Sequence, residues 1–328
     1  MNTIKVALVG YGLSGKSFHA PLISSCSELE IVAVVSSRAD EIKKDFPGVT
    51  ICDFKKSLEI SDLVIITTPH QLHFKQAKDA LLAGKHVVVE KPFTQTLNEA
   101  QELFALAKDR GLFLSVFFNR RYDADFLTIK KLIDSKVLGE IISIESHFDR
   151  FRVEAKENAW REKSGPQSGV WWDLGPHLID QALQLMGTPE DIDFDIARQR
   201  ESVEADDYFD VTFKYPKGRR FHLRASCIVK DFGFRFRIHG TKGSALFEQL
   251  DVQESQLRSG MTPNDLAFGQ YPADSFKISE GIRVELEKGS YLSFYQEVVK
   301  GIKTNLDQSV LKNEVLFNTT VLLGNKSF

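Results

Sequence analysis

The chain has 328 residues, and a usual domain size of roughly 100–200 residues predicts about two domains. Apolar residues make up 42% of it and charged residues 27%, ordinary proportions for a globular protein that argue against a disordered chain. Lys and Arg number 42 against 45 Asp and Glu, so the formal charge of −3 gives no basic excess of the kind that nucleic-acid binding favours.

The sequence has none of the usual marks of secretion or membrane insertion. Its three cysteines, Cys26, Cys52 and Cys227, are odd in number and widely spaced, so they predict neither a disulfide framework nor a CxxC metal site. The longest apolar runs fall far short of the roughly 18–20 residues that a membrane-spanning helix needs. The first residues show no signal-peptide pattern. We therefore expect a cytoplasmic protein without a membrane or nucleic-acid partner.

The first third of the chain alternates between short β-branched runs and helix-length segments. The runs are continuously apolar, as in strands of a parallel sheet that is covered on both faces. Gly84 and Gly111 each follow a helical segment and suit its C-terminal cap. The pattern predicts a doubly wound parallel α/β (Rossmann) domain over 1–120. Its expected strands are 4–9, 31–35, 63–67, 86–89 and 112–117, and its expected helices 16–25, 39–46, 73–83 and 97–110.

Beyond residue 120 the pattern changes to alternating apolar and polar residues in strands joined by short turns. Such alternation is typical of an antiparallel sheet with one exposed face. We expect an α+β domain over 121–328, with a large, open, mostly antiparallel sheet whose exposed face is available to a second subunit. The expected strands are 140–148, 207–214, 220–228, 234–238 and 245–248, with helices over 126–134 and 290–303.

A glycine-rich loop follows the first expected strand and precedes the first expected helix. Its sequence, GYGLSG, matches the GxGxxG pattern of dinucleotide-binding proteins. The first glycine of that pattern permits a tight turn, the second lets the backbone approach a pyrophosphate, and the third lets the helix pack on the sheet. The loop residues expected to bind the cofactor are Gly10, Gly12, Leu13, Ser14 and Gly15.

The same residues also fit GxxxxGK[ST], the phosphate-binding loop of nucleotide triphosphatases. Lys16 would then bind the β- and γ-phosphates and Ser17 a magnesium ion. That site needs an acidic residue near a strand end, and only Glu90 is available. The dinucleotide interpretation is favoured, and a tight turn without any ligand is the remaining alternative.

The end of the second expected strand distinguishes between two nicotinamide cofactors. An NAD site places an acidic residue about 20 residues after the glycines, where it binds the ribose 2′-hydroxyl. This chain has Ser36, Ser37 and Arg38 there. A guanidinium binds a 2′-phosphate through charge-assisted hydrogen bonds, whereas a carboxylate repels it. The sequence therefore predicts NADP(H) in preference to NAD(H), unless Arg38 is an ordinary surface residue.

Two further segments carry groups suited to proton transfer. Glu90-Lys91-Pro92 follows the fourth expected strand, and a lysine there can polarise a substrate oxygen. If Asp173 opens a helix, it shares one helical face with His177, and Pro176 lies in the first turn. A histidine can take a hydroxyl proton at neutral pH. The alternatives are a loop lysine, an aspartate N-cap and a buried structural histidine.

These segments together make the chain resemble the Gfo/Idh/MocA oxidoreductase family over nearly its whole length. The resemblance depends on EKP at 90–92 and GxxxDxGxH at 169–177, in that order behind GxGxxG. It is supported by TTPHQLH at 67–73, NRR at 119–121 and WRE at 160–162. Within the family the chain is most similar to NADP-dependent scyllo-inositol dehydrogenases, through SSR at 36–38, NRRYDADFLTIKKLI at 119–133 and WREK at 160–163.

The resemblance implies roles for individual residues. Lys91 corresponds to the catalytic lysine, His177 to the general acid/base and Asp173 to its neighbour in the site. Family members commonly form dimers or tetramers through the exposed sheet. The residues matching cofactor or active-site positions are Thr67, Thr68, Pro69, His73, Glu90, Lys91, Asn119, Arg121, Trp160 and Arg161.

We therefore expect an NADP(H)-dependent dehydrogenase acting on a secondary alcohol of a cyclic polyol or sugar, or on the corresponding ketone. The first alternative is a non-catalytic NADP-binding sensor on the same fold. The second is a reductase of another carbonyl or imine substrate. The eight histidines show no HExxH spacing, so no metal site is predicted.

Overall fold

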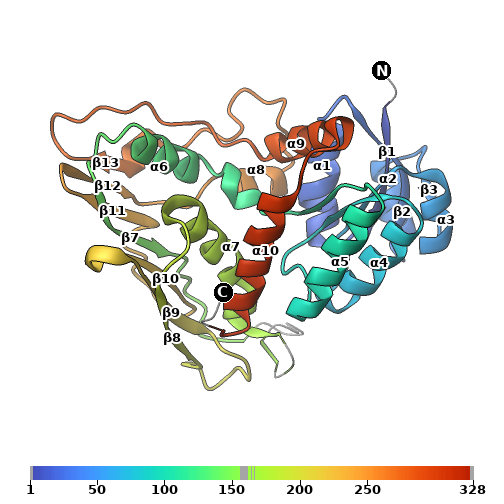
Figure 1. The fold of residues 1–328 in the computed structure, drawn as a ribbon. Helices are drawn as coiled ribbons and strands as arrows, with labels where there is room; N and C mark the ends of the chain where they lie inside the picture. Colours follow the sequence, from blue (N-terminus) through green and yellow to red (C-terminus); the bar gives the residue numbers. More distant parts are fainter. Residues whose placement is uncertain (1–2, 156–161, 164, 166, 326–328) are drawn as a thin grey trace. The chain divides into compact units, whose positions relative to one another are not determined.

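The computed structural model describes residues 3–155, 162, 163, 165 and 167–325. The chain forms two compact units, each built on its own β-sheet (Figure 1). The first unit contains 1–122, 252–269 and 290–319, so it includes two segments from beyond residue 120. The second unit contains 123–251, 270–289 and 320–328.

The first unit has a six-stranded parallel sheet in the order β3-β2-β1-β4-β5-β6. The order changes direction between β1 and β4, and ligands of such sheets bind beyond the carboxyl ends of the strands at that position. The strands are β1 (Ile4–Val9), β2 (Leu29–Val35), β3 (Thr50–Ile51), β4 (Leu63–Ile66), β5 (His86–Val89) and β6 (Leu114–Val116).

The predicted Rossmann sheet is thus confirmed. Along the chain between β2 and β4 it has a further strand, β3, and a further α-helix, α3. The two-residue β3 and the seven-residue α3 are shorter than the segments that periodicity can identify. The expected helix over 16–25 is a π-helical turn followed by an α-helix. The helical segments are η1 (Gly15–His19), α1 (Ala20–Ser24), α2 (Ala39–Asp45), α3 (Phe54–Ile60), η2 (His70–Leu72), α4 (His73–Leu82), α5 (Leu97–Asp109), η3 (Asn119–Tyr122), α8 (Gln253–Arg258) and α9 (Tyr291–Thr304).

The continuously apolar strands follow from burial on both faces of this sheet. In β4, Leu63 and Ile65 belong to one hydrophobic cluster, which includes residues of α1 and α9. Val64 and Ile66 belong to the other cluster, which includes residues of α4 and α5. Helices α4 and α5 pack side by side (Figure 1). Each face therefore needs an apolar residue at every second position, and the two sets together give an unbroken apolar run.

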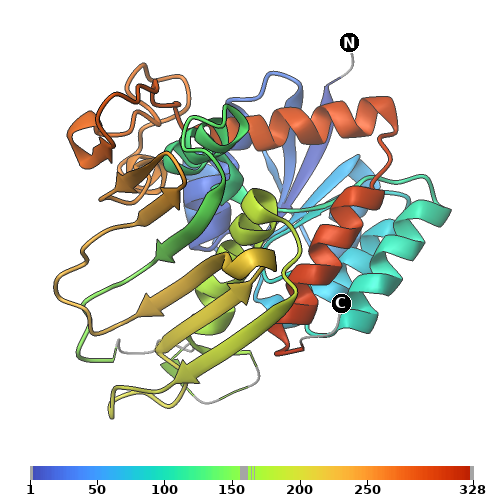
Figure 2. The same ribbon diagram turned by 60° about the vertical axis from the view of Figure 1, so that its left-hand side comes forward.

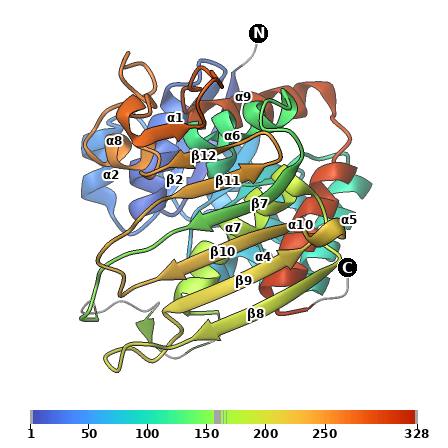
Figure 3. The same cartoon turned by 90° about the vertical axis from the view of Figure 1, so that its left-hand side faces the viewer.

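The second unit has a seven-stranded sheet in the order β13-β12-β11-β7-β10-β9-β8, as Figure 3 shows for the strands from β12 to β8. Among its described pairs only β7 and β10 are parallel. The prediction of a large, mostly antiparallel sheet is confirmed. The strands are β7 (Ile141–His147), β8 (Asp191–Ala197), β9 (Tyr208–Lys214), β10 (Arg220–Ser226), β11 (Phe236–Gly240), β12 (Gly243–Phe247) and β13 (Phe276–Ile278).

One face of the second sheet is buried against a long helix, α7 (Gly169–Met186), which packs on β9 and β10 (Figure 2). In β9 the side chains of Phe209, Val211 and Phe213 are fully buried, while the residues between them are partly exposed. The ring of Trp171 meets Phe209 edge-on, with 5.0 Å between ring centroids. Other helical segments of this unit are α6 (Ala124–Asp134), η5 (Pro216–Gly218) and η6 (Ala273–Ser275), whereas α10 (Ser309–Leu322) belongs mostly to the first unit.

The first sheet ends at β6, and the side chain of Gln308 bonds to the outer edge of this strand. Gln308 accepts a hydrogen bond from the amide of Leu114 (2.7 Å) and donates one to the carbonyl of Leu112 (3.0 Å). Its carboxamide thereby makes the two bonds that a neighbouring strand would make.

We expect Gln308→Ala to lower the free energy of unfolding by about 1–2 kcal/mol, because two strand-edge groups lose their partners. Urea denaturation followed by circular dichroism measures this change. Gln308→Glu keeps the acceptor for Leu114 but sets a carboxylate oxygen against the carbonyl of Leu112, so it should be no more stable than Gln308→Ala. Equal stability of all three proteins would contradict the prediction.

Candidate active site

The glycine loop joins β1 to η1, and two of its glycines are required by the chain itself. Gly10 has a φ of +102°, which other residues rarely adopt. A Cβ atom added to Gly10 would lie 2.7 Å from Oγ1 of Thr67, and one added to Gly15 would lie 2.9 Å from the same atom. Thr67 in turn donates a hydrogen bond to the carbonyl of Gly10 (3.0 Å). These contacts hold the loop against the end of β4.

Gly12 differs, because a Cβ atom there would meet nothing within 4 Å and its φ is not positive. The fold therefore does not require glycine at this position. Open space over the middle of the loop suits a group that approaches the backbone closely, as a pyrophosphate does in dinucleotide-binding proteins. The loop thus fits a dinucleotide cofactor.

Lys16 does not point its charge at this loop. Its Nζ lies 2.8 Å from Oε2 of Glu41 and 3.4 Å from Oδ2 of Asp45, both in α2. These pairs raise the pKa of Lys16 and lower that of Glu41, chiefly through the hydrogen bond between the two. The geometry gives no support to the phosphate-binding-loop alternative, which needs this lysine at the phosphates.

Ser36, Ser37 and Arg38 directly follow β2, beyond its carboxyl end. The Arg38 side chain is 54% exposed, and its nearest charged group is the Glu41 carboxylate at 3.5 Å. An exposed guanidinium with one distant partner is available to bind an anion, since a surface ion pair of this kind contributes little stability.

Beyond β4, His73 links two of the candidate segments. Its ring nitrogens lie 2.9 Å from the carbonyl oxygen of Thr68 and 2.9 Å from that of Pro92. Burial lowers the pKa of His73, although these carbonyls oppose the shift. The neighbouring Thr68 hydroxyl donates to Gln76 (2.6 Å), and Pro69 precedes η2. His73 therefore connects the backbone that follows β4 with the backbone that follows β5.

Glu90, at the end of β5, connects the glycine loop with Lys91. The hydroxyl of Ser14 donates a hydrogen bond to Oε1 of Glu90, and the amide of Lys91 donates to Oε2 (3.0 Å). Burial by itself would raise the pKa of Glu90. The hydrogen bond and charge of His19, the charge of Lys91 and the Ser14 hydroxyl together outweigh burial and lower the pKa to about 2. Glu90 is therefore an anion at neutral pH.

Asp173 and His177 lie one turn apart in α7, as predicted, but the helix does not begin at Asp173. It begins at Gly169 with Ser168 as N-cap, so Pro176 is in the helix interior. An interior proline leaves one carbonyl without its helical partner, which is why the sequence favours a later start. Burial of most of α7 outweighs this cost. The prediction that Asp173 opens the helix is wrong, and so is its alternative role as N-cap.

The two side chains differ in exposure and partners. His177 is 5% exposed, and the Asp173 carboxylate lies 3.6 Å from the guanidinium of Arg150. Lys91 belongs to the first unit, whereas Asp173 and His177 belong to the second. The α7 start is held by Asp206, which accepts a hydrogen bond from the amide of Trp171 (2.7 Å).

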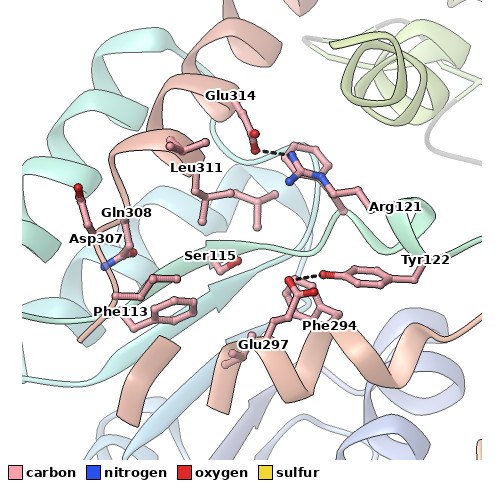
Figure 4. A pocket seen from close by; sticks show the side chains of 15 residues that line it. Phe113, Ser115, Arg121, Tyr122, Phe294, Glu297, Asp307, Gln308, Leu311 and Glu314 are labelled. Atoms are coloured by element: carbon pink, nitrogen blue, oxygen red, sulfur yellow. Dashed lines mark hydrogen bonds and ion pairs between the residues drawn. The ribbon is translucent and has the colours of Figure 1, made fainter. Parts of the chain in front are cut away.

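The remaining candidates have other surroundings. Asn119 is buried in η3. Arg121 forms an ion pair with Glu314 (2.8 Å) and lines a cavity of about 300 Å³ beside β6, in which Tyr122 also donates to Glu297 (Figure 4). No glycine-loop residue lines this cavity. Trp160 and Arg161 lie outside the described residues.

Comparison with known proteins decides the family. An oxidoreductase family model with an NAD-binding Rossmann fold matches residues 4–118, and the GFO/IDH/MocA C-terminal domain matches 126–246. The chain belongs to the Gfo/Idh/MocA oxidoreductase family. It is therefore an oxidoreductase with an NAD-binding Rossmann fold, as the sequence predicts.

Relatives of this Gfo/Idh/MocA protein include enzymes with assigned reactions. The NADP-dependent scyllo-inositol 2-dehydrogenase IolW of Bacillus subtilis is 38% identical over 92% of this chain and 87% of its own. The uncharacterized oxidoreductase YdgJ of Escherichia coli is 47% identical over 79% of this chain and 75% of its own. The crystal structure of an oxidoreductase from Bacillus cereus, 29% identical, covers 98% of this chain and 95% of its own with a TM-score of 0.87.

Two features are absent from the described residues of this family member. Within the described residues, no group of three or more His, Cys, Asp or Glu side chains is placed to hold a metal ion. None of the helices in the described part of the chain is long and apolar enough to cross a membrane.

The glycine loop yields a test that separates fold from binding. We expect Gly10→Ala to destabilise the protein by about 1–3 kcal/mol, because of its positive φ and the clash with Thr67. We expect Gly12→Ala to change stability by no more than about 0.5 kcal/mol, while weakening NADPH binding by about tenfold or more, because the added methyl group occupies the approach to the backbone. Thermal unfolding and NADPH fluorescence titration measure the two effects. Unchanged NADPH affinity in Gly12→Ala would refute this account of the loop.

Proposed function

We propose that this protein is an NADP(H)-dependent dehydrogenase of a cyclic polyol or sugar, interconverting a secondary alcohol and a ketone. The observation that carries the proposal is the Ser14–Glu90–Lys91 connection, which holds the backbone of the predicted catalytic lysine to the predicted cofactor loop. The assigned reactions of IolW and of a glucose-6-phosphate 3-dehydrogenase, 28% identical over 73% of this chain, support the substrate class.

In the proposed reaction, His177 Nε2 or Nδ1 takes the proton of the substrate hydroxyl, and Asp173 orients the imidazole. The Lys91 ammonium donates a hydrogen bond to the substrate oxygen and stabilises the charge that develops there. A bound nicotinamide supplies the acceptor for the hydride that leaves the carbon. In the reverse direction His177 returns the proton to the oxygen.

The fixed anion at Glu90 supports the proposed role of Lys91. Its carboxylate accepts a hydrogen bond from the Lys91 amide, and the charge of Lys91 in turn helps to lower the pKa of Glu90. A protonated lysine can donate a hydrogen bond to an alkoxide, whereas a neutral amine is a weaker donor.

We further propose that the cofactor is NADP(H), bound at its 2′-phosphate by Ser36, Ser37 and Arg38. The exposed face of the second sheet is the proposed contact between subunits. The three cysteines are free thiols, which is consistent with a reducing cytoplasmic location.

We expect Lys91→Ala and His177→Ala each to lower kcat by roughly 10²–10⁴, as loss of acid–base and electrostatic assistance does. Absorbance at 340 nm with NADP⁺ and a panel of inositols and hexoses measures the rate. Lys85→Ala, before the same strand β5, and His222→Ala, on β10, are matched controls with unchanged rates. Rates close to those of the controls in both variants would refute the catalytic assignment. Tight NADPH binding without turnover on any substrate would instead favour the sensor function.

We expect Arg38→Ala to weaken NADP⁺ binding by roughly 10–100-fold, the loss typical of a charge-assisted hydrogen bond to a phosphate, and to leave NAD⁺ binding nearly unchanged. KM values for the two cofactors, measured side by side, give the comparison. An equal effect on both would show that Arg38 does not recognise the 2′-phosphate.

A further inference from the structure

His19, a buried histidine that the sequence does not identify, is connected to the candidate lysine, Lys91, through Glu90. His19, the last residue of η1, is fully buried, and its ring contacts that of Phe117 in a tilted arrangement with 4.2 Å between centroids. Tyr295 of α9 is fully buried beside it. A polar ring enclosed by aromatic residues needs hydrogen-bonding partners within the protein, because its removal from water is otherwise costly.

Both nitrogens of this ring have such partners. Nδ1 is hydrogen-bonded to the hydroxyl of Tyr295, and Nε2 lies 3.0 Å from Oε1 of Glu90. An ionised carboxylate can only accept, so Nε2 of His19 carries the hydrogen of this bond. Burial raises the pKa of Tyr295 well above its usual range, so its hydroxyl keeps its proton in the bond with Nδ1.

We propose that His19, held by Tyr295, is a positioning residue that keeps the Glu90 carboxylate ionised and oriented, and thereby holds Ser14 and the backbone of Lys91 in register for the reaction. The proposal rests on the proposed dehydrogenase function. It assigns a role to His19 and Tyr295, which form no described hydrogen bond with Lys91 or with the glycines of the loop.

The Glu90 carboxylate depends on the number of hydrogen-bond donors around it. The Glu90 side chain is 12% exposed and accepts from three donors: Ser14, His19 and the amide of Lys91. Without the N–H of His19, a largely buried anion loses one of these bonds. It then either moves toward water or takes up a proton, because burial disfavours an incompletely paired charge. Either response disturbs the bonds to Ser14 and to Lys91.

The direction of the pH effect follows from the same groups. The titratable groups that interact with Glu90 are His19 and Lys91, with His73 and Tyr295 also in its field. The hydrogen bond and charge of His19 oppose burial and lower the pKa of Glu90. Removing them raises that pKa, so the carboxylate loses its charge at a higher pH than in the unaltered protein.

Four variants separate positioning from stability. His19→Leu removes both bonds of the imidazole, whereas His19→Gln restores an N–H at a similar distance from the backbone. Tyr295→Phe removes only the hydroxyl that bonds Nδ1. Tyr291→Phe is the matched control, because Tyr291 lies one turn earlier in α9 and is equally buried.

Steady-state rates between pH 3 and 9, NADPH dissociation constants over the same range and thermal unfolding midpoints are measured for the full-length protein. We expect His19→Leu to lower kcat about tenfold at neutral pH. We also expect it to raise, by about one pH unit or more, the low pH at which protonation of Glu90 lowers kcat. Its NADPH affinity should weaken on the acid side. His19→Gln should recover most of both effects, Tyr295→Phe should lie between them, and Tyr291→Phe should match the unaltered protein.

An unchanged acid limb of the kcat profile and unchanged pH dependence of NADPH binding in His19→Leu would overturn the proposal. So would a loss of rate that simply follows the unfolding midpoint across all four variants. If the unaltered protein turns over no polyol or sugar, the proposed function fails, but NADPH binding still decides this proposal. A pH-dependent weakening in His19→Leu that His19→Gln reverses supports it, and identical profiles overturn it.

Discussion

The first unit depends on one largely buried carboxylate. Glu90 ends β5, and its oxygens accept hydrogen bonds from the glycine loop and from the next residue along the chain. A charge in such a position is destabilising unless several donors surround it, so the surrounding residues are constrained as a group. The loop, the strand end and the lysine therefore have one common anchor. This explains how a short EKP segment and a GxGxxG loop, 75 residues apart by number from Gly15 to Glu90, act together.

The glycines of the loop show two kinds of constraint. Gly10 is set by packing against Thr67, and Gly15 by packing against the carbonyl of Gly10 and against Thr67, so both would be needed even if no ligand bound. Gly12 has no neighbour to avoid, and its lack of a side chain is explained by a ligand. The distinction separates residues that build the Rossmann turn from the residue that leaves space for the cofactor. A sequence pattern alone treats all three alike.

Much of the fold is predictable because the strands of the first sheet are mostly apolar on both faces, whereas strands of the second, such as β9, are apolar at alternate positions. Strands β1 and β5 begin and end where the sequence predicts. Strand β3 has only two residues, and β8, β13 and α10 were not predicted. The start of α7 was misplaced because Pro176 suggests a first turn, whereas burial of the helix tolerates it in the interior. Tertiary packing outweighs local preference there.

The candidate site is only partly accessible from the sequence for a different reason. Lys91 and His177 stand in short motifs, so their spacing identifies them. His19 and Tyr295 are 276 positions apart, and no local pattern indicates that they share a hydrogen bond. The same holds for Arg121 and Glu314, whose ion pair lines the cavity beside β6.

The Gln308 carboxamide beside β6 also bears on self-association. Exposed strand edges recruit strands from other molecules, and proteins shorten or cover them to stay dispersed. At one edge of this sheet β3 is two residues long, and at the other Gln308 occupies the backbone groups of Leu112 and Leu114. Both ends of the sheet are thus poor templates for aggregation, and at β6 the protection comes from one polar side chain.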